Sequence, residues 1–330
     1  MKPRISHQIQ MISIPLICSL VVLPNGLAQN VSSGEDKMSA SSLMSRADSL
    51  FERRQYDQAR EVYLLAADSA AASGDNCSLT EAYAMIARTY LTTDKKDEGR
   101  PWIEKARERA RNNEPLGWSR YLGVRGRFEW QDKELEKATA TFKEMYQYCS
   151  EKGLHERAID AAHMVAITGG HEDQVEWGLK GIKEAEAGNI TSWLGPLWNN
   201  LGFTYEDMGK YRESLDAYLK AREYHHKYSD EKSKIVADWA VGHAYRLLGE
   251  SDSAAQWITQ DMLARFESLG DAEFQGWTLK EMGEIAMLKS KPDSALALFI
   301  RAEGKLRAAD MANWDPEGYK KLQEQIEKLR

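Results

Sequence analysis

The sequence is poor in residues that interrupt helices. Of its 330 residues, 8 are proline and 23 are glycine. Alanine, leucine, glutamate, lysine and arginine are frequent instead, and these residues lose little conformational freedom in a helix. With 42% hydrophobic and 29% charged residues, the chain can also bury a substantial core. The composition therefore predicts an all-α protein.

The sequence also lacks a surplus of positive charge. It has 44 lysine and arginine residues against 51 aspartate and glutamate residues, which gives a formal net charge of -7. A protein that binds nucleic-acid phosphates usually carries a basic excess on its binding face. We therefore expect no nucleic-acid partner, although this net charge is compatible with a local basic patch.

Motifs for catalysis and metal binding are absent from the sequence. GxSxG, HExxH, P-loop and GxGxxG patterns do not occur in a suitable context, and the 7 histidines are scattered. His225 and His226 are adjacent, and adjacent helix positions point about 100° apart, so the pair cannot share a helical face as metal ligands. His171 is followed directly by Glu172 and Asp173 in a turn, where Asp173 is better explained as a helix start. We expect no enzyme, no cofactor and no metal.

The only long apolar run of the sequence lies near its N-terminus, between Met11 and Pro24. It follows Lys2 and Arg4 and precedes small residues that end at Ala28, which is typical of a secretory signal. About 14 apolar residues are too few to span a bilayer comfortably. We expect cleavage after Ala28 and export to the periplasm or outside the cell, with retention as a membrane anchor as the alternative. No later segment looks transmembrane.

The stretch WNNLGFTYEDMGKYRESLDAYLKA, residues 198–221, has the pattern of two packed helices joined by a turn. Bulky or small residues recur every three or four positions on either side of Gly209, at Trp198, Leu201, Gly202 and Tyr205 and then at Ser214, Tyr218 and Ala221. This spacing puts each set on one helical face and predicts a helical hairpin. The pattern closely resembles the tetratricopeptide repeat, and only Ser214 departs from it, in place of an alanine.

The same pattern recurs along the chain in six further copies. The small residue of each first helix is found at positions 47, 87, 126, 163, 202, 242 and 283, in steps of 40, 39, 37, 39, 40 and 41. The common repeat has 34 residues, so each unit here has about six more, which predicts a longer second helix, a longer connection, or both. In the fourth copy His163 stands at the small-residue position, which predicts a core imidazole, and Leu179 is among the packing residues.

The resemblance implies a right-handed superhelical solenoid of about seven hairpins, because no hairpin of this family buries its apolar face alone. The tail places Leu322, Ile326 and Leu329 on one stripe, which suits a C-terminal capping helix. Polar and small residues before the array suit a flexible lead-in. The expected order is a signal peptide, the lead-in, the tetratricopeptide-like array and the capping helix, at residues 1–28, 29–39, 40–309 and 310–330.

Cysteine is scarce, with three residues in the chain. Cys18 lies in the expected signal, which leaves Cys77 and Cys149. An array places about four helices between these two, at 8–10 Å per neighbouring axis. A disulfide needs Cα atoms within about 7 Å. We therefore expect two free and mostly buried thiols.

In the family, the first helices line the inner groove of the solenoid. At the groove positions, the first half of the array has Arg88, Arg120, Arg127, Trp130 and Arg157. The second half has Asn199, Phe203, Trp239, His243, Arg246, Trp277 and Lys280. Arginine and tryptophan often dominate binding energy, through charge-assisted hydrogen bonds and large desolvated contacts. The resemblance thus implies a non-catalytic scaffold that binds a protein or peptide segment with acidic and apolar anchors.

Two alternatives stay open at this point. In the first, the tryptophans pack between helices and the arginines pair with Glu81, Glu129 and Asp160. In the second, the chain is the sensory region of a bacterial envelope signalling system, because exported forty-residue arrays resemble such regions. The carboxylate clamp of chaperone-binding tetratricopeptide domains is disfavoured, since around the fifth unit only Asn200 matches its residues.

Overall fold

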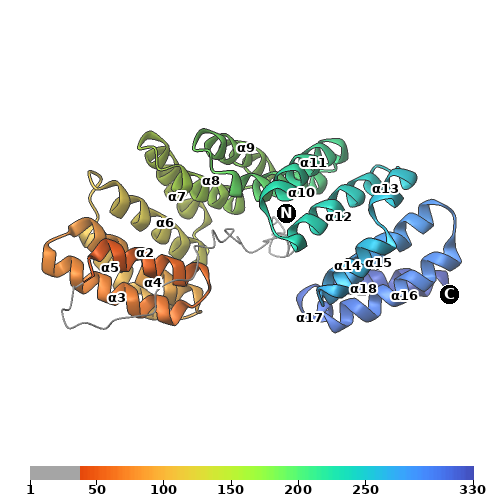
Figure 1. Ribbon diagram of the computed structural model, residues 1–330, viewed down its shortest axis with the longest axis horizontal. Coiled ribbons are helices and arrows are strands. Elements are labelled where there is room, and N and C mark those ends of the chain that lie inside the picture. Colours follow the sequence, from red (N-terminus) through yellow and green to blue (C-terminus); the bar gives the residue numbers. More distant parts are fainter. Residues whose placement is uncertain (1–37) are drawn as a thin grey trace, which may run out of the picture. The chain divides into compact units, whose positions relative to one another are not determined.

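The structure is a computed structural model that describes residues 38–330 (Figure 1). The chain divides into two compact units, an N-terminal unit that ends at Ile190 and a C-terminal unit, Thr191–Arg330. The described residues form helices joined by short connections, and they contain no β-strand. The predicted signal peptide with its cleavage site, Cys18 and the lead-in up to residue 37 lie outside the described residues.

The N-terminal unit consists of four consecutive helical hairpins. They are α2 (Ala40–Glu52) with α3 (Tyr56–Ser73), α4 (Asn76–Thr92) with α5 (Lys96–Arg109), α6 (Pro115–Gln131) with α7 (Leu135–Glu151), and α8 (His155–Thr168) with α9 (His171–Ala187). In each pair the two helices pack against one another, and α4 also packs against α6. The first helices of successive hairpins are therefore neighbours in this unit.

The C-terminal unit consists of three hairpins and a terminal helix. After the short η1 (Thr191–Trp193) come α10 (Leu194–Asp207) with α11 (Tyr211–Tyr228), α12 (Glu231–Leu247) with α13 (Ser251–Trp257) and α14 (Gln260–Ser268), and α15 (Ala272–Leu288) with α16 (Pro292–Ala308). The chain then forms α17 (Met311–Trp314) and α18 (Pro316–Leu329). Helix α18 packs against α16 through the buried Leu322 and Ile326. The predicted all-α solenoid of seven hairpins is confirmed.

Each hairpin is closed by a tight turn, and six of the seven turns have three residues. The middle residue of these six turns has a positive φ, and the six are Arg54, Asp94, Lys133, Gly209, Gly249 and Ser290. The residue that follows donates its N–H to the carbonyl five positions back, as Lys210 does to Tyr205 at 2.8 Å. This bond satisfies a carbonyl at the end of the first helix.

The two helices of a hairpin meet where a small residue faces a bulky one sixteen positions later. A Cβ atom added at Gly126 would lie 2.6 Å from the Phe142 ring, and one added at Gly283 would lie 2.5 Å from the Phe299 ring. Only a residue without a side chain allows these rings to approach so closely. The same spacing relates Ala47 to Tyr63, Ala87 to Ile103, Gly202 to Tyr218 and Gly242 to Ile258.

The fourth hairpin departs from this spacing, and the prediction that His163 fills its small packing position is wrong. Its turn has two residues, 169–170, and its second helix begins at His171. In the other six hairpins the second helix begins nine residues after the small residue, which points to Ala162 in the fourth. Ala162 is fully buried, whereas His163 is half-buried.

The second helix of this hairpin also buries a side chain at a different position. Trp177, fifteen positions after Ala162, is 6% exposed, whereas Leu179 is 44% exposed. The expectation that Leu179 packs in the core is therefore wrong. Helix α8 continues one residue further than the other first helices and its turn is one residue shorter, and the tryptophan of α9 takes the place of the bulky core residue.

The residues beyond the common repeat length extend the second helices. Helix α3 ends at Ser73 and α11 ends at Tyr228, each about two turns past the small residue of that helix. Two-residue connections then lead into the next hairpin, where Asp75 caps α4 by accepting from the Ser78 N–H at 3.0 Å. The longer second helix was one of the predicted alternatives.

The sixth hairpin is the exception, because its second helix is interrupted. Helix α13 ends at Trp257, and Thr259 adopts an extended conformation with φ -116° and ψ 164°. The Thr259 hydroxyl then accepts from the Met262 N–H at 3.2 Å and caps α14. Ile258, just before the break, still fills the space beside Gly242.

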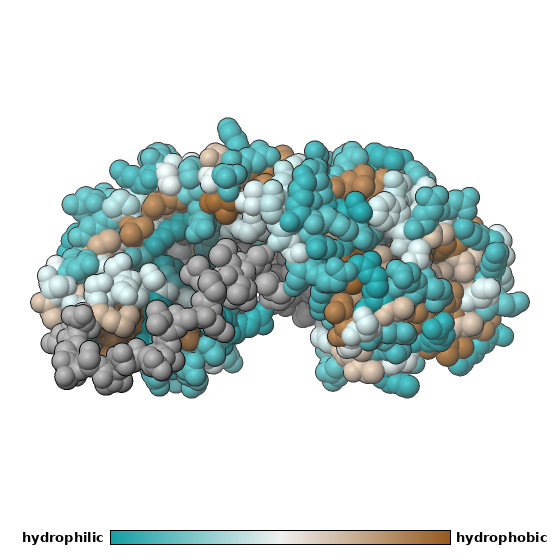
Figure 2. Space-filling model, in the orientation of Figure 1, coloured by the Kyte–Doolittle hydropathy of each residue, from teal (hydrophilic) through white to brown (hydrophobic). Residues whose placement is uncertain are grey.

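Both cysteines of the described part are free, as predicted. Cys149 is buried and Cys77 half-buried, and burial raises the pKa of the Cys149 thiol to about 12. Among residues 38–330, no helix is both long and apolar enough to cross a membrane. Figure 2 shows hydrophilic residues over most of the visible surface, with hydrophobic residues in smaller patches, as expected when each helix buries one stripe.

Candidate binding faces on the first helices

Every residue that the sequence predicts to bind a partner lies on the first helix of a hairpin. In the N-terminal unit these residues come from α4, α6 and α8, and in the C-terminal unit from α10, α12 and α15. We call the surface formed by the first helices of one unit its first-helix face. The two units are described separately.

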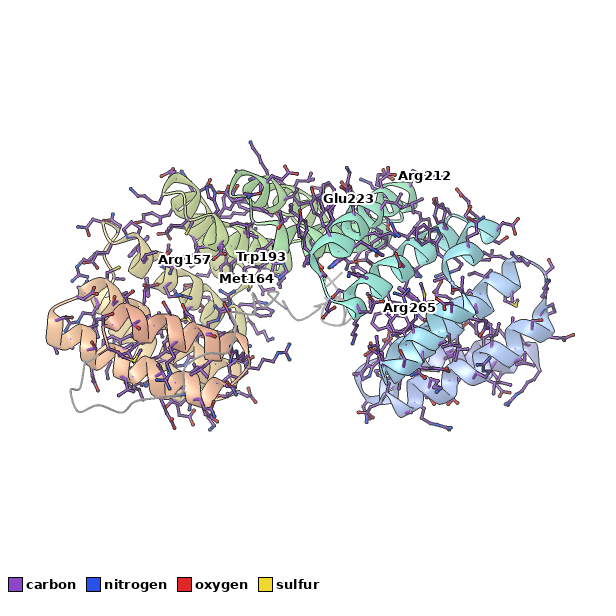
Figure 3. All side chains as sticks on the ribbon, viewed as in Figure 1. Arg157, Met164, Trp193, Arg212, Glu223 and Arg265 are labelled. Carbon is purple, nitrogen blue, oxygen red and sulfur yellow. The ribbon has the colours of Figure 1, made fainter. Side chains whose placement is uncertain are left out.

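An ion-pair network crosses the first-helix face of the N-terminal unit. Arg120 on α6 donates to Asp48 on α2 at 2.8 Å and to Glu81 on α4 at 3.3 Å. Arg157 on α8, which Figure 3 labels, also donates to Glu81. The Arg120 side chain thus reaches past α4 to α2, and the Arg157 side chain reaches past α6 to α4. Side chains of α2, α4, α6 and α8 are therefore joined on one face.

A second pair lies farther along the same face. Arg127 on α6 donates to Asp160 on α8 at 2.6 Å and to the Gly123 carbonyl at 2.9 Å. Burial alone would raise the pKa of Asp160, but Arg127 and Arg88 lower it to about 2. His163 lies beside this pair, and burial lowers its pKa despite the nearby Asp160.

Arg88 is the exception among these arginines, because it forms no ion pair with a described residue. Its guanidinium carbon lies 5.0 Å from the centroid of the Phe51 ring, and the side chain is half-buried. Burial lowers the pKa of Arg88 to about 10, and the neighbouring Arg127 and Arg120 act in the same direction. Asp160 opposes this shift, although its oxygen already accepts from Arg127.

The remaining predicted residue of this unit is Trp130, which is partly buried and packs against the core cluster around Phe142. Glu129, which the sequence offered as a partner for the candidate arginines, instead accepts from Arg125 at 2.9 Å and from Thr141 at 2.6 Å. Arg120, Arg127 and Arg157 therefore pair with carboxylates of the protein itself, as the first alternative expected. Asp48 is an additional carboxylate partner.

The C-terminal unit carries a compact charged cluster on its first-helix face. His243 on α12 lies 3.1 Å from Glu206 on α10 and 3.0 Å from Glu281 on α15. Arg246 donates to Glu281 at 2.8 Å. Burial alone would lower the pKa of His243, but the two carboxylates raise it to about 9. The imidazole is therefore positively charged at neutral pH.

Aromatic side chains flank this cluster. The Trp239 ring stacks on His243 with centroids 5.0 Å apart and meets the edge of Phe274 at 5.8 Å. Trp277 lies 6.4 Å from Trp314 of α17, so it packs between helices. Lys280 lies 5.6 Å from the Trp277 ring and also approaches a neighbouring carboxylate.

Three N–H groups on the first helices of this unit have no hydrogen-bond partner among the described residues. They are Nε1 of Trp198, Nδ2 of Asn199 and Nε1 of Trp239, and all three atoms are buried. Asn199 is 2% exposed, and Asn199 and Trp239 each stand three positions before the small residue of their hairpin. Phe203, just after Gly202, is half-buried on the same helix as Asn199.

The histidines that the sequence excluded as ligands are accounted for by local contacts. His225 is buried and lies 2.8 Å from the Ser229 hydroxyl, and His226 lies 2.8 Å from Asp238. His226 thus pairs across to α12, whereas His225 is turned inward, as expected for adjacent helix positions. In the part of the chain that the structure describes, no group of side chains is arranged to hold a metal ion.

The sequence and the fold can now be compared with those of known proteins. The tetratricopeptide repeat model matches residues 80–113 and 195–223, which fall on the second and fifth hairpins. The fold is similar to that of a signal transduction ATPase with a tetratricopeptide repeat sensor from Pyrococcus horikoshii, with a TM-score of 0.67, at 14% identity over 84% of this chain and 44% of that one. This chain thus spans less than half of the ATPase chain. A search of curated proteins gives no match.

Two further solved structures are similar over nearly their whole length. The apo form of RapI has a TM-score of 0.69 at 12% identity, over 87% of this chain and 85% of that one. The C-terminal part of a tetratricopeptide repeat protein from Cytophaga hutchinsonii has a TM-score of 0.54 at 15% identity, over 86% of this chain and 99% of that one. The chain thus contains tetratricopeptide repeats at the matched residues, and it has the fold of a tetratricopeptide repeat solenoid.

The tetratricopeptide register explains which functional residues sequence reasoning missed. The residue directly after the small residue lies on the first-helix face, as Arg88, Arg127 and His243 do. Asp48 occupies this position in the first hairpin, directly after Ala47, yet it was not among the predicted residues. Reading every repeat at that one position would have found Asp48. The carboxylates of Glu206 and Glu281 lie at other positions, and nothing in their spacing marked them.

Proposed function

We propose that this protein is a non-catalytic scaffold that binds a protein or peptide segment on its first-helix faces. The observation that carries the proposal is the pair of unpartnered N–H groups on Asn199 and Trp239. A buried donor without an acceptor costs about 1–3 kcal/mol, so such groups are rare unless a ligand or water satisfies them. Both atoms are buried, so carbonyl oxygens of a bound segment reach them only when the side chains that cover them move aside.

A segment on the C-terminal face carries apolar groups toward Trp239, and a segment on the N-terminal face carries acidic groups toward the arginines of that unit. Trp239 rests on a charged imidazole, which holds the indole in one orientation and makes it a rigid contact surface. Trp277 is a weaker candidate because it already packs on Trp314. In the N-terminal unit, Arg120, Arg127 and Arg157 are partly neutralised by their own carboxylates.

A matched set of variants tests this function. The double variant N199A/W239F removes both of these donors and keeps an aromatic ring, and W257F makes the same aromatic change on the second helix α13. Extracts of the source organism are passed over each immobilised protein. We expect a bound protein that wild type and W257F retain and that N199A/W239F loses at least tenfold. Equal recovery on all three proteins would contradict the proposal.

We also propose that the protein is exported. The basic residues Lys2 and Arg4, the apolar run and the small residues up to Ala28 support a cleaved signal. The intact mass of the protein isolated from its source tests this directly. Loss of the first 28 residues is the expected result, and a full-length protein in the cytoplasm would exclude export.

A sensory role is the second candidate. It is favoured by the fold similarity to an ATPase whose tetratricopeptide repeats are described as a sensor. In this case the bound segment is a signal, and its binding changes the activity of a signalling protein. Deleting the gene and measuring the phosphorylation of envelope signalling proteins separates the two roles, because a passive scaffold leaves signalling unchanged in the absence of its cargo.

A further inference from the structure

The charges on the first-helix face of the N-terminal unit do not pair off completely. Arg120 is matched by Asp48 and Glu81, Arg127 by Asp160, and Arg157 shares Glu81. Arg88 lies among these groups without a carboxylate of its own among the described residues. Among the described residues, the network therefore leaves one guanidinium without an ion pair.

The surroundings of Arg88 hold it in place without neutralising it. The Phe51 ring lies 5.0 Å from the guanidinium carbon, which fixes the side chain by a cation–π contact. Arg127 and Arg120 repel it, and burial removes part of its hydration, so the pKa of Arg88 is lowered to about 10. A half-buried charge in this position is costly unless an anion approaches.

We propose that Arg88 is a subsite for one carboxylate of the bound protein segment. The inference rests on the proposed scaffold function and names the chemistry that this face recognises. A guanidinium presents its N–H donors in a planar fork that fits a carboxylate with two parallel hydrogen bonds. A cation–π contact with Phe51 uses the face of the guanidinium and not its N–H donors.

The neighbouring acidic residues limit the site to one carboxylate. Glu52 lies near Arg120, and its pKa is raised by burial and by the charges of Asp48 and Glu156. Negative charge is therefore already concentrated on the Arg120 side of the network. A second carboxylate or a doubly charged phosphate would be repelled there, so a single acidic side chain fits better than an acidic tract.

The first test compares the stability of two matched variants. R88M replaces an uncompensated charge with an apolar chain of similar length, so the midpoint of urea unfolding is expected to stay equal or rise. R127M leaves Asp160 without its partner, and its midpoint is expected to fall. A clear fall for R88M would show that Arg88 has a structural partner, and it would overturn the proposal.

The second test measures carboxylate binding directly by nuclear magnetic resonance. The probes are the acetylated tripeptide amides Ala-Glu-Ala and Ala-Gln-Ala and inorganic phosphate, at equal ionic strength. We expect a saturable shift of the Arg88 Nε–H signal with Ala-Glu-Ala, at least tenfold weaker binding of the other probes, and loss of the effect in R88M. Uniform shifts of all arginine signals, or a preference for phosphate, would overturn the single-carboxylate subsite.

These outcomes are separate from those of the scaffold proposal. If Arg88 fails both tests while the N199A/W239F variant still loses the captured protein, the scaffold function stands and the subsite is wrong. If the captured protein is unaffected by N199A/W239F but Arg88 binds the Glu peptide, the subsite stands and the assignment of the C-terminal face is wrong.

Discussion

The two units of the molecule share one packing rule and differ in the chemistry of their first-helix faces. In both, a small residue of the first helix receives a bulky side chain of the second, as at Gly126 and Gly283. The N-terminal face then carries arginine–carboxylate pairs that reach across an intervening helix. The C-terminal face carries one compact histidine–carboxylate–arginine cluster with a stacked indole. Hairpin packing thus does not determine which side chains occupy the first-helix face.

The packing of a bulky side chain on a small residue can be removed by substitution in each unit separately. These substitutions should have the largest effects on stability of all that we predict. F142A in the N-terminal unit and F299A in the C-terminal unit each remove a fully buried ring that faces a glycine. Each change should lower the free energy of unfolding of its unit by about 3–5 kcal/mol. Urea unfolding checks the size, and amide hydrogen exchange shows which unit is affected. If one variant is neutral, the two units do not share the rule.

The charged clusters should respond differently to loss of one carboxylate. E281Q leaves His243 and Arg246 buried without their shared negative charge, and it should cost about 3 kcal/mol. D160N removes a partner of Arg127 at a more exposed site, where solvent screens the charge, so about 1–2 kcal/mol is expected. Urea unfolding of both variants gives the comparison. An equal or larger loss for D160N would contradict the assignment of the C-terminal cluster as the more buried one.

The stabilities of the two units should fall at opposite ends of the pH scale. The pKa of His243 is raised from 6.5 to about 9, so its stabilisation is complete below pH 6.5 and is lost as the pH rises through 9. The pKa of Asp160 is lowered from 3.8 to about 2, so its stabilisation is complete above pH 3.8 and is lost as the pH falls through 2. We expect a loss on the order of 2 kcal/mol in the C-terminal unit between pH 6.5 and 9.

Hydrogen exchange at several pH values checks this prediction. Between pH 6.5 and 9, exchange corrected for the intrinsic rate should accelerate in α12 and α15 and stay constant in α6 and α8. The H243Q variant is the control, because it removes the titrating group and should abolish the alkaline change. An alkaline change that persists in H243Q would assign the effect to another group.

The smallest expected effect concerns the interrupted helix of the sixth hairpin. T259A removes the hydroxyl that caps α14, which should cost about 1 kcal/mol. S294A, at the start of the continuous α16, is a matched control because no capping bond is assigned to its hydroxyl, and it should change stability by less than about 0.5 kcal/mol. Thermal unfolding of the two variants measures how much the Thr259 cap stabilises the start of α14.

The repeat pattern was enough to predict the helices, the hairpins and the free thiols, because packing imposes small and aromatic residues at fixed spacing. It failed at His163 and Leu179 in the fourth hairpin, where the turn of Gly169 and Gly170 has two residues and the other turns have three. The break at Thr259 was also unforeseen, since the surrounding residues are compatible with a helix. The predicted arginines are on one face, but their pairing depends on side chains from non-adjacent repeats, which spacing within one hairpin does not reveal.

The central claim is that partners bind the first-helix faces, and site-specific photo-crosslinking in the source organism tests it most directly. A photoreactive phenylalanine derivative replaces Phe203 on a first helix or, as controls, Leu65 on α3 and Ile300 on α16, which are 55% and 45% exposed. Our account predicts that Phe203 gives a discrete crosslinked protein, that N199A/W239F weakens this adduct, and that the two controls give none. Adducts from Leu65 or Ile300 with none from Phe203 would contradict it.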